Sequence, residues 1–78
     1  PNPFNPTTTI RFSLPEKVQL KINIYNMLGE LVETLAKGTY EAGYHIVMFN
    51  ASSLSSGAYI YRIESSQYVQ TRKMLLLK

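Results

Sequence analysis

The chain has 78 residues, enough for one small domain whose single core buries only about 60% of the surface that the unfolded chain exposes. Its formal charge of +3 comes from eight scattered basic residues and five glutamates, with no clustered basic groove of the kind that binds nucleic acid. Cysteine and aspartate are absent, His45 is the only histidine and no wholly apolar run exceeds four residues, so we expect no enzyme, cofactor, metal site or transmembrane segment.

The N-terminal part of the chain predicts a proline-rich lead-in followed by two strands. Residues 1–6 contain three prolines, which favour extended backbone, and we expect this segment to dock Phe4 on the domain. Residues 7–14 alternate between apolar and polar side chains, and Pro15 ends that strand. Residues 18–24 alternate for longer and form the clearest strand in the sequence.

The central part is less regular. Residues 26–30 predict a turn in which Gly29 can adopt a positive φ, and residues 31–35 predict a short strand, although residues 28–36 also fit one face of a helix. We expect a loop between Lys37-Gly38 and Glu41-Ala42-Gly43, then a strand over residues 44–49. Residues 50–57 are a polar connection that has Leu54 as its apolar anchor and Asn50 as a turn-former.

Two further strands complete the domain. Residues 58–63 form one, a tight turn follows at residues 65–67, and residues 68–77 form the last. Short strands at regular spacing with polar turns predict an all-β, immunoglobulin-like antiparallel sandwich of about seven strands. We expect eight side chains to be largely buried: Val18, Leu20, Ile22, Ile24, Val47, Phe49, Tyr61 and Ile63.

The strand over residues 44–49 has an unusual pattern. His45 alternates with Val47 and Phe49, so we expect it to be a partly buried, hydrogen-bonded strand residue rather than a metal ligand. The same alternation leaves Tyr44, Ile46 and Met48 on the outer face, where an apolar stripe marks a possible contact surface. The alternative is a one-residue bulge that turns these three side chains inward.

Read together, several motifs resemble the C-terminal sorting domains, type A, of the bacterial type IX secretion system. The motifs are Asn2-Pro3-Phe4-Asn5-Pro6, the turn ending at Gly29, Ala42-Gly43, the Leu54–Tyr59 segment with Gly57, and the ending Lys73-Met74-Leu75-Leu76-Leu77-Lys78. The resemblance covers essentially the whole chain, residues 1–78, as one sorting domain. It implies a seven-stranded immunoglobulin-like sandwich at the C-terminus of a secreted or cell-surface cargo protein.

The resemblance also implies partners and a route. The cargo would reach the periplasm through an N-terminal signal that precedes this segment. An outer-membrane translocon with its shuttle protein would then recognise the sorting domain, and in many members a sortase-like peptidase removes it. We interpret the tail, residues 72–78, as the signal that the translocon reads, within a final segment of residues 68–78. Its residues are Arg72, Lys73, Met74, Leu75, Leu76, Leu77 and Lys78.

Two other functions stay open from the sequence. The first is a structural or self-assembling immunoglobulin-like module of a surface protein. The second is a carbohydrate-binding module, for which Tyr25, Tyr59 and Tyr61 are candidate sugar-stacking residues. We expect these three tyrosines to lie in the core or in cross-strand pairs instead. The absence of tryptophan also weakens the carbohydrate hypothesis.

Overall fold

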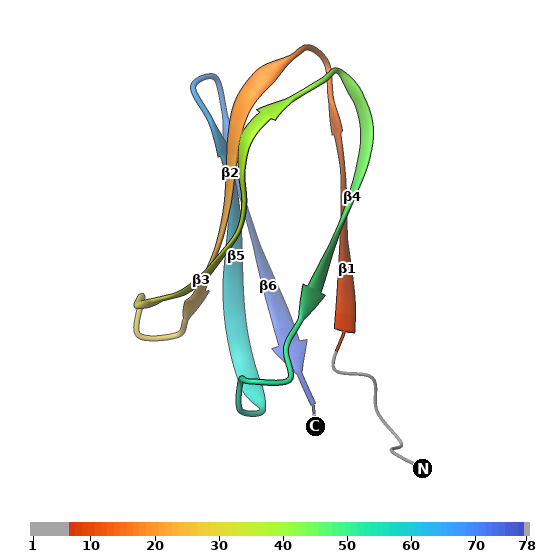
Figure 1. The fold of residues 1–78 in the computed structure, drawn as a ribbon. Coiled ribbons are helices and arrows are strands. Elements are labelled where there is room, and N and C mark those ends of the chain that lie inside the picture. The colour runs from red at the N-terminus through yellow and green to blue at the C-terminus, as the bar shows by residue number, and fades with distance from the viewer. Residues whose placement is uncertain (1–6, 78) are drawn as a thin grey trace.

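The computed structural model describes residues 7–77. These residues form six antiparallel strands in two sheets, joined by turns and short loops (Figure 1). The strands are β1 (Thr7–Leu14), β2 (Val18–Asn26), β3 (Leu31–Tyr40), β4 (Gly43–Asn50), β5 (Gly57–Ser65) and β6 (Val69–Leu76). The predicted all-β antiparallel sandwich is confirmed, with six strands among these residues instead of about seven. No helix in the described part is long and apolar enough to cross a membrane.

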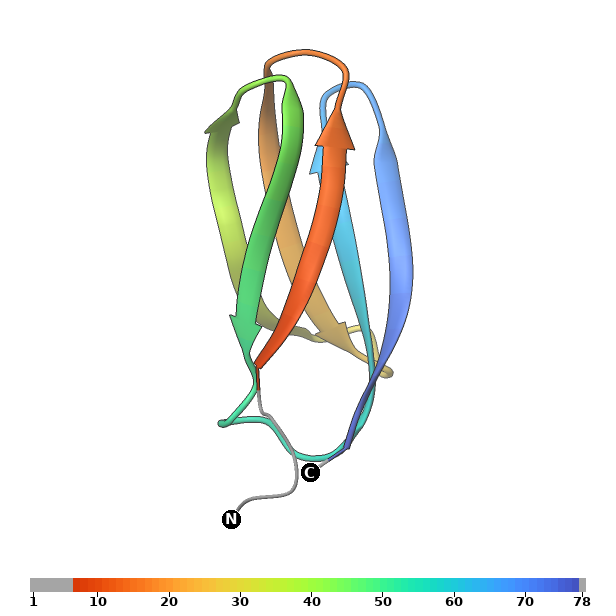
Figure 2. The same ribbon diagram turned by 90° about the vertical axis from the view of Figure 1, so that its right-hand side faces the viewer.

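The two sheets differ in size. β1 pairs with β4 alone, over eight residues without a register shift, and the other sheet has the order β3-β2-β5-β6. Figure 2 shows the two-stranded sheet lying over the four-stranded one, with β1 toward the β6 side and β4 toward the β3 side. The larger sheet therefore has one face toward the core and one face, here called the outer face, turned away from β1 and β4.

Alternation along the strands builds the core between the sheets. Side chains at every second position of β1 and β2 point inward and join one residue of β5 in a first cluster: Ile10, Phe12, Leu14, Val18, Leu20, Ile22 and Ile63. A second cluster occupies the other end of the sandwich and contains Ile24, Phe49, Ala51, Tyr59 and Leu76. Leu54 packs against this second cluster, as the sequence predicted for the anchor of the polar connection.

Six of the eight side chains predicted to be largely buried are buried, and Val47 and Tyr61 are only partly so. Val47 lies on β4, which among residues 7–77 has a neighbouring strand on one side only, so part of its side chain stays accessible at the rim of the sandwich. Tyr61 packs against both clusters and fills the space between them without being enclosed by either.

The prediction for residues 31–43 was wrong in two respects. The chain forms a ten-residue strand, not the short strand of residues 31–35 or a helical face, and Lys37 and Gly38 lie inside it instead of opening a loop. The register with β2 skips Val32 and Leu35, which are the extra residues of two β-bulges. Bulges disturb the alternation of a strand, and here they place Val32 and Leu35 against the core.

His45 occupies the position that the sequence predicted. Its ring stacks on Phe12 with the ring centroids 5.4 Å apart and meets the ring of Tyr40 edge-on at 5.3 Å. Its Nε2 lies 2.7 Å from the backbone oxygen of Glu41. The side chain is therefore a partly buried packing residue that also joins the start of β4 to the preceding loop.

Candidate recognition surface

The tail divides into a buried half and an exposed half. Within β6, Leu76 is buried in the second cluster and Met74 packs partly against it. Leu75 and Leu77 are 68% and 69% exposed, and Arg72 and Lys73 are exposed too. Only the inward half of the apolar run is thus needed for folding. Lys78 lies outside the described residues.

Strand register brings part of the tail together with residues distant in sequence. Residues directly opposite one another in antiparallel strands share a face of the sheet. Lys73 lies opposite Ile60, which in turn lies opposite Tyr25, and Tyr25 lies opposite Leu31. One row of side chains therefore crosses the outer face from β3 to β6, and Leu75 extends it one step along β6, opposite Ala58.

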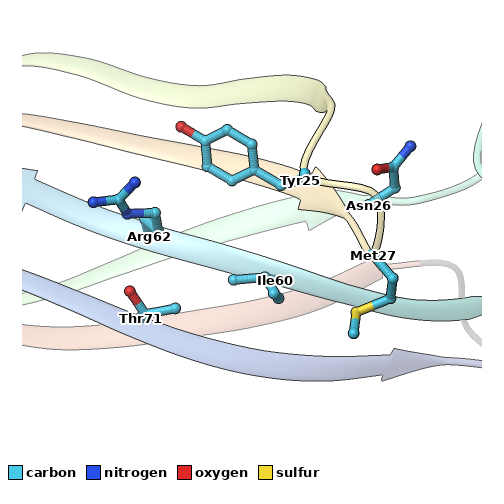
Figure 3. A pocket seen from close by; sticks show the side chains of 7 residues that line it. Tyr25, Asn26, Met27, Ile60, Arg62 and Thr71 are labelled. Atoms are coloured by element: carbon cyan, nitrogen blue, oxygen red, sulfur yellow. The ribbon is translucent and has the colours of Figure 1, made fainter.

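A shallow hollow of about 360 Å³ lies on this face between the end of β2 and the middle of β5 and β6. Figure 3 shows Met27 over the Ile60 side of the hollow, with Tyr25 and Arg62 on its other side. The lining residues are Tyr25, Asn26, Met27, Gly29, Ile60, Arg62 and Thr71. The hollow is thus bounded by the predicted turn at Gly29 and lies beside the tail.

The turn between β2 and β3 is held in place by Asn26. Its Oδ1 accepts hydrogen bonds from the backbone N–H groups of Leu28 at 2.9 Å and Glu30 at 3.0 Å, and its Nδ2 donates to Oε1 of Glu30 at 2.8 Å. Gly29 has φ of 84°, a left-handed conformation that residues with a Cβ rarely adopt. This rigid turn presents Met27 and Leu28 to solvent, with Leu28 85% exposed.

A polar network lies beneath Tyr25. Asn23 is buried, donates from Nδ2 to the hydroxyl of Tyr25 at 3.1 Å and accepts from the hydroxyl of Thr34 at 2.7 Å. These bonds hold the tyrosine ring on the outer face of the sheet. Of the two placements expected for Tyr25, it takes the cross-strand pair, opposite Ile60, and not the core, because Ile24 occupies the inward position and alternation turns Tyr25 outward.

The outer face is basic as well as apolar. By register it carries four cationic side chains and one carboxylate: Lys21, Lys37, Arg62, Lys73 and Glu64. Arg62 is half-buried, and its Nε is a buried nitrogen without a hydrogen-bond partner among residues 7–77. A partner that binds here would meet a mixed surface of hydrocarbon and positive charge.

The other predicted site residues lie elsewhere. Gly43 begins β4 and Gly57 begins β5, while the motif residues Asn2 to Pro6 fall outside the described part of the chain. Tyr44, Ile46 and Met48 are on the two-stranded sheet, and β1 and β4 pair without a bulge. Sequence reasoning missed Ile60, Arg62 and Thr71, which no local motif marks. Residues 7–77 contain no cluster of acidic, histidine or cysteine side chains able to hold a metal ion.

Comparison with models of known protein families gives a match over nearly the whole chain. The model of a family described as a secretion system C-terminal sorting domain matches residues 1–77, essentially the whole chain. No curated protein and no solved structure matches the chain significantly.

Proposed function

The chain belongs to the family of secretion system C-terminal sorting domains, and we propose that it directs a cargo protein through the type IX outer-membrane translocon by presenting the tail and the adjoining outer face. The observation that carries this proposal is the division of the tail. Leu75 is exposed next to the buried Leu76, so half of the apolar run has no task in folding. That half adjoins Lys73 and the hollow.

The position of β6 supports a physical mechanism for recognition. β6 is an edge strand that pairs only with β5 among the described residues, so one side of its backbone is free to bind another protein. Arg72 and Lys73 lie in the middle of this edge, where charges discourage indiscriminate strand pairing. A translocon component can combine backbone pairing with apolar contacts to Leu75 and Leu77.

The proposal includes a route and further partners. The cargo passes through the periplasm to the translocon, which works with a shuttle protein. A sortase-like peptidase then removes the domain at the cell surface. The domain acts by binding and performs no catalysis, as befits a sorting signal. A carbohydrate platform is less well supported, because Tyr59 is buried and Tyr61 half-buried, which removes two of its three rings from the surface.

Charge reversal in the tail tests the proposal. With this chain fused behind a reporter, we expect the Lys73→Glu and Lys78→Glu double variant to accumulate in the periplasm. Surface charge changes usually alter stability by about 0.5 kcal/mol or less. At about 4–8 °C per kcal/mol for a domain of this size, the thermal midpoint should move by only a few degrees.

The matched control is Arg11→Glu with Lys17→Glu, which changes the net charge equally but away from β6 and from the outer face of the larger sheet. The ion pair of Lys17 with Glu41 is exposed and contributes little to stability. The control should be exported normally. Normal export of the folded tail variant would contradict a charge-dependent signal, and equal defects in both variants would indicate an effect of net charge alone.

A further inference from the structure

The side chains of β4 that face away from the core are apolar, although they are exposed to solvent. Tyr44, Ile46 and Met48 are 62%, 56% and 68% exposed, and they follow one another at alternate positions. Their partners on β1 are Ser13, Arg11 and Thr9, so the apolar side chains form a single stripe along β4. Exposed apolar surface of this kind usually marks a contact site.

The backbone of β4 is equally open. Among residues 7–77 it pairs only with β1, which leaves its other side free over a strand of eight residues. Natural proteins protect such edges with charges, prolines or bulges. Every other strand with a free edge has such protection, as a charge or a bulge: Arg11 in β1, Lys37 and two bulges in β3, and Arg72 and Lys73 in β6. β4 has no lysine, arginine or glutamate, no proline and no bulge.

We propose that β4 pairs with β4 of a second copy of this chain, antiparallel and about a two-fold axis at Ile46. This register places Ile46 opposite its own copy and Tyr44 opposite Met48 of the partner, where sulfur and aromatic ring make a favourable contact. The three exposed apolar side chains of each copy then make cross-strand contacts with those of the other copy, which removes part of their surface from water. The two small sheets become one sheet with the order β1-β4-β4-β1.

Charge favours a second copy as the occupant. β4 has no lysine, arginine or glutamate, and the proposed register places His45 opposite Val47 of the other copy. Two copies therefore bring no like charges into direct opposition, which would destabilise the pair. The nearest cation is Arg11, opposite Ile46 on β1. In the proposed sheet the two copies of Arg11 are three strand spacings apart, about 14 Å, and physiological salt screens charges beyond about 8 Å. This inference is independent of the proposed sorting function.

Sedimentation equilibrium of the 78-residue chain tests the proposal. We expect the weight-average mass to rise with concentration from 8.9 kDa toward twice that value. Ile46→Glu should raise the dissociation constant about tenfold or more, which corresponds to 1.4 kcal/mol, because two glutamates then meet at the axis. Within each copy the new glutamate lies opposite Arg11, so the variant should remain folded.

The matched control is Leu31→Glu, which places the same change at an exposed apolar position of another edge strand. It should leave association unchanged. A wild-type chain that stays monomeric at millimolar concentration, or equal dissociation of both variants, would overturn self-pairing through the stripe.

A disulfide test fixes the register. The chain has no cysteine, and Cα atoms of opposed residues in antiparallel strands are about 4.5–5.5 Å apart, within the range that a disulfide bridges. Under mild oxidation Ile46→Cys should form a covalent dimer much faster than Val69→Cys, a control on the exposed side of β6. Equal rates at the two positions would contradict pairing through β4.

Discussion

Replacing Phe49 with alanine should lower the free energy of unfolding by about 3–5 kcal/mol. The ring is completely buried and is the largest fully buried side chain of the second core cluster, where it packs with Ile24, Tyr59 and Leu76 from the opposite sheet. Domains are stable by about 5–15 kcal/mol in total. A chain this small belongs near the lower limit, so the variant should be largely unfolded at 37 °C.

Urea or thermal unfolding followed by circular dichroism measures this effect. For a domain of this size, the thermal midpoint should fall by at least about 12 °C. Met48→Ala is the matched control, because Met48 is the adjacent residue of β4 and is 68% exposed. It should change stability by about 0.5 kcal/mol or less. Similar losses in the two variants would contradict the alternation of β4.

The adjacent leucines of the tail should have opposite phenotypes. Leu76→Ala removes a buried side chain from the second cluster and should cost about 2–5 kcal/mol of stability. Leu75→Ala removes an exposed one and should leave the free energy of unfolding within about 0.5 kcal/mol. If the translocon reads Leu75, losing about 1–1.4 kcal/mol of that contact lowers affinity about five- to tenfold, and the secreted fraction of a fused reporter should fall.

Two measurements on the same pair of variants separate folding from recognition. Thermal unfolding of the isolated chain gives the cost to the fold, and fractionation of the reporter between medium and periplasm gives the cost to export. Full export of the stable Leu75→Ala variant would remove Leu75 from the signal. Deleting residues 74–78 does not make this separation, because it also removes Leu76 from the core.

Strict alternation was the most informative feature of the sequence. Residues 20–26 of β2 pair with β5 without any shift, and the apolar side chains of residues 18–24 are buried as predicted. The exposure of Tyr44, Ile46 and Met48 followed from the same rule, since β4 also pairs without a bulge. Where two strands pair regularly and one face is buried, the period of two determines which side chains point inward.

The rest of the structure depends on pairing that local patterns do not encode. Val32 and Leu35 are bulge residues, so β3 lost its alternation and its length was underestimated. The hollow joins Tyr25 of β2, Arg62 of β5 and Thr71 of β6, which become neighbours only through the register of three strands. No spacing within one segment could have indicated them.

The pairing of β1 with β4 has a consequence for the time that folding takes. The paired residues are 29 positions apart at Leu14 and Gly43 and 43 apart at Thr7 and Asn50, whereas β2 and β3 are joined by a short turn. Hairpins close in about 1–10 µs, but folds dominated by distant pairings take milliseconds to seconds. The pairing of β2 with β5 spans a similar distance, 33 positions at Asn26 and Tyr59 and 45 at Leu20 and Ser65. Both distant pairings should therefore form after the hairpins, which leaves Ile10 and Phe12 in water meanwhile. Stopped-flow refolding in which Phe12→Leu slows folding as much as it destabilises the domain would contradict late docking of β1. The aggregation hazard of a newly made chain is then set by this waiting period more than by its final stability.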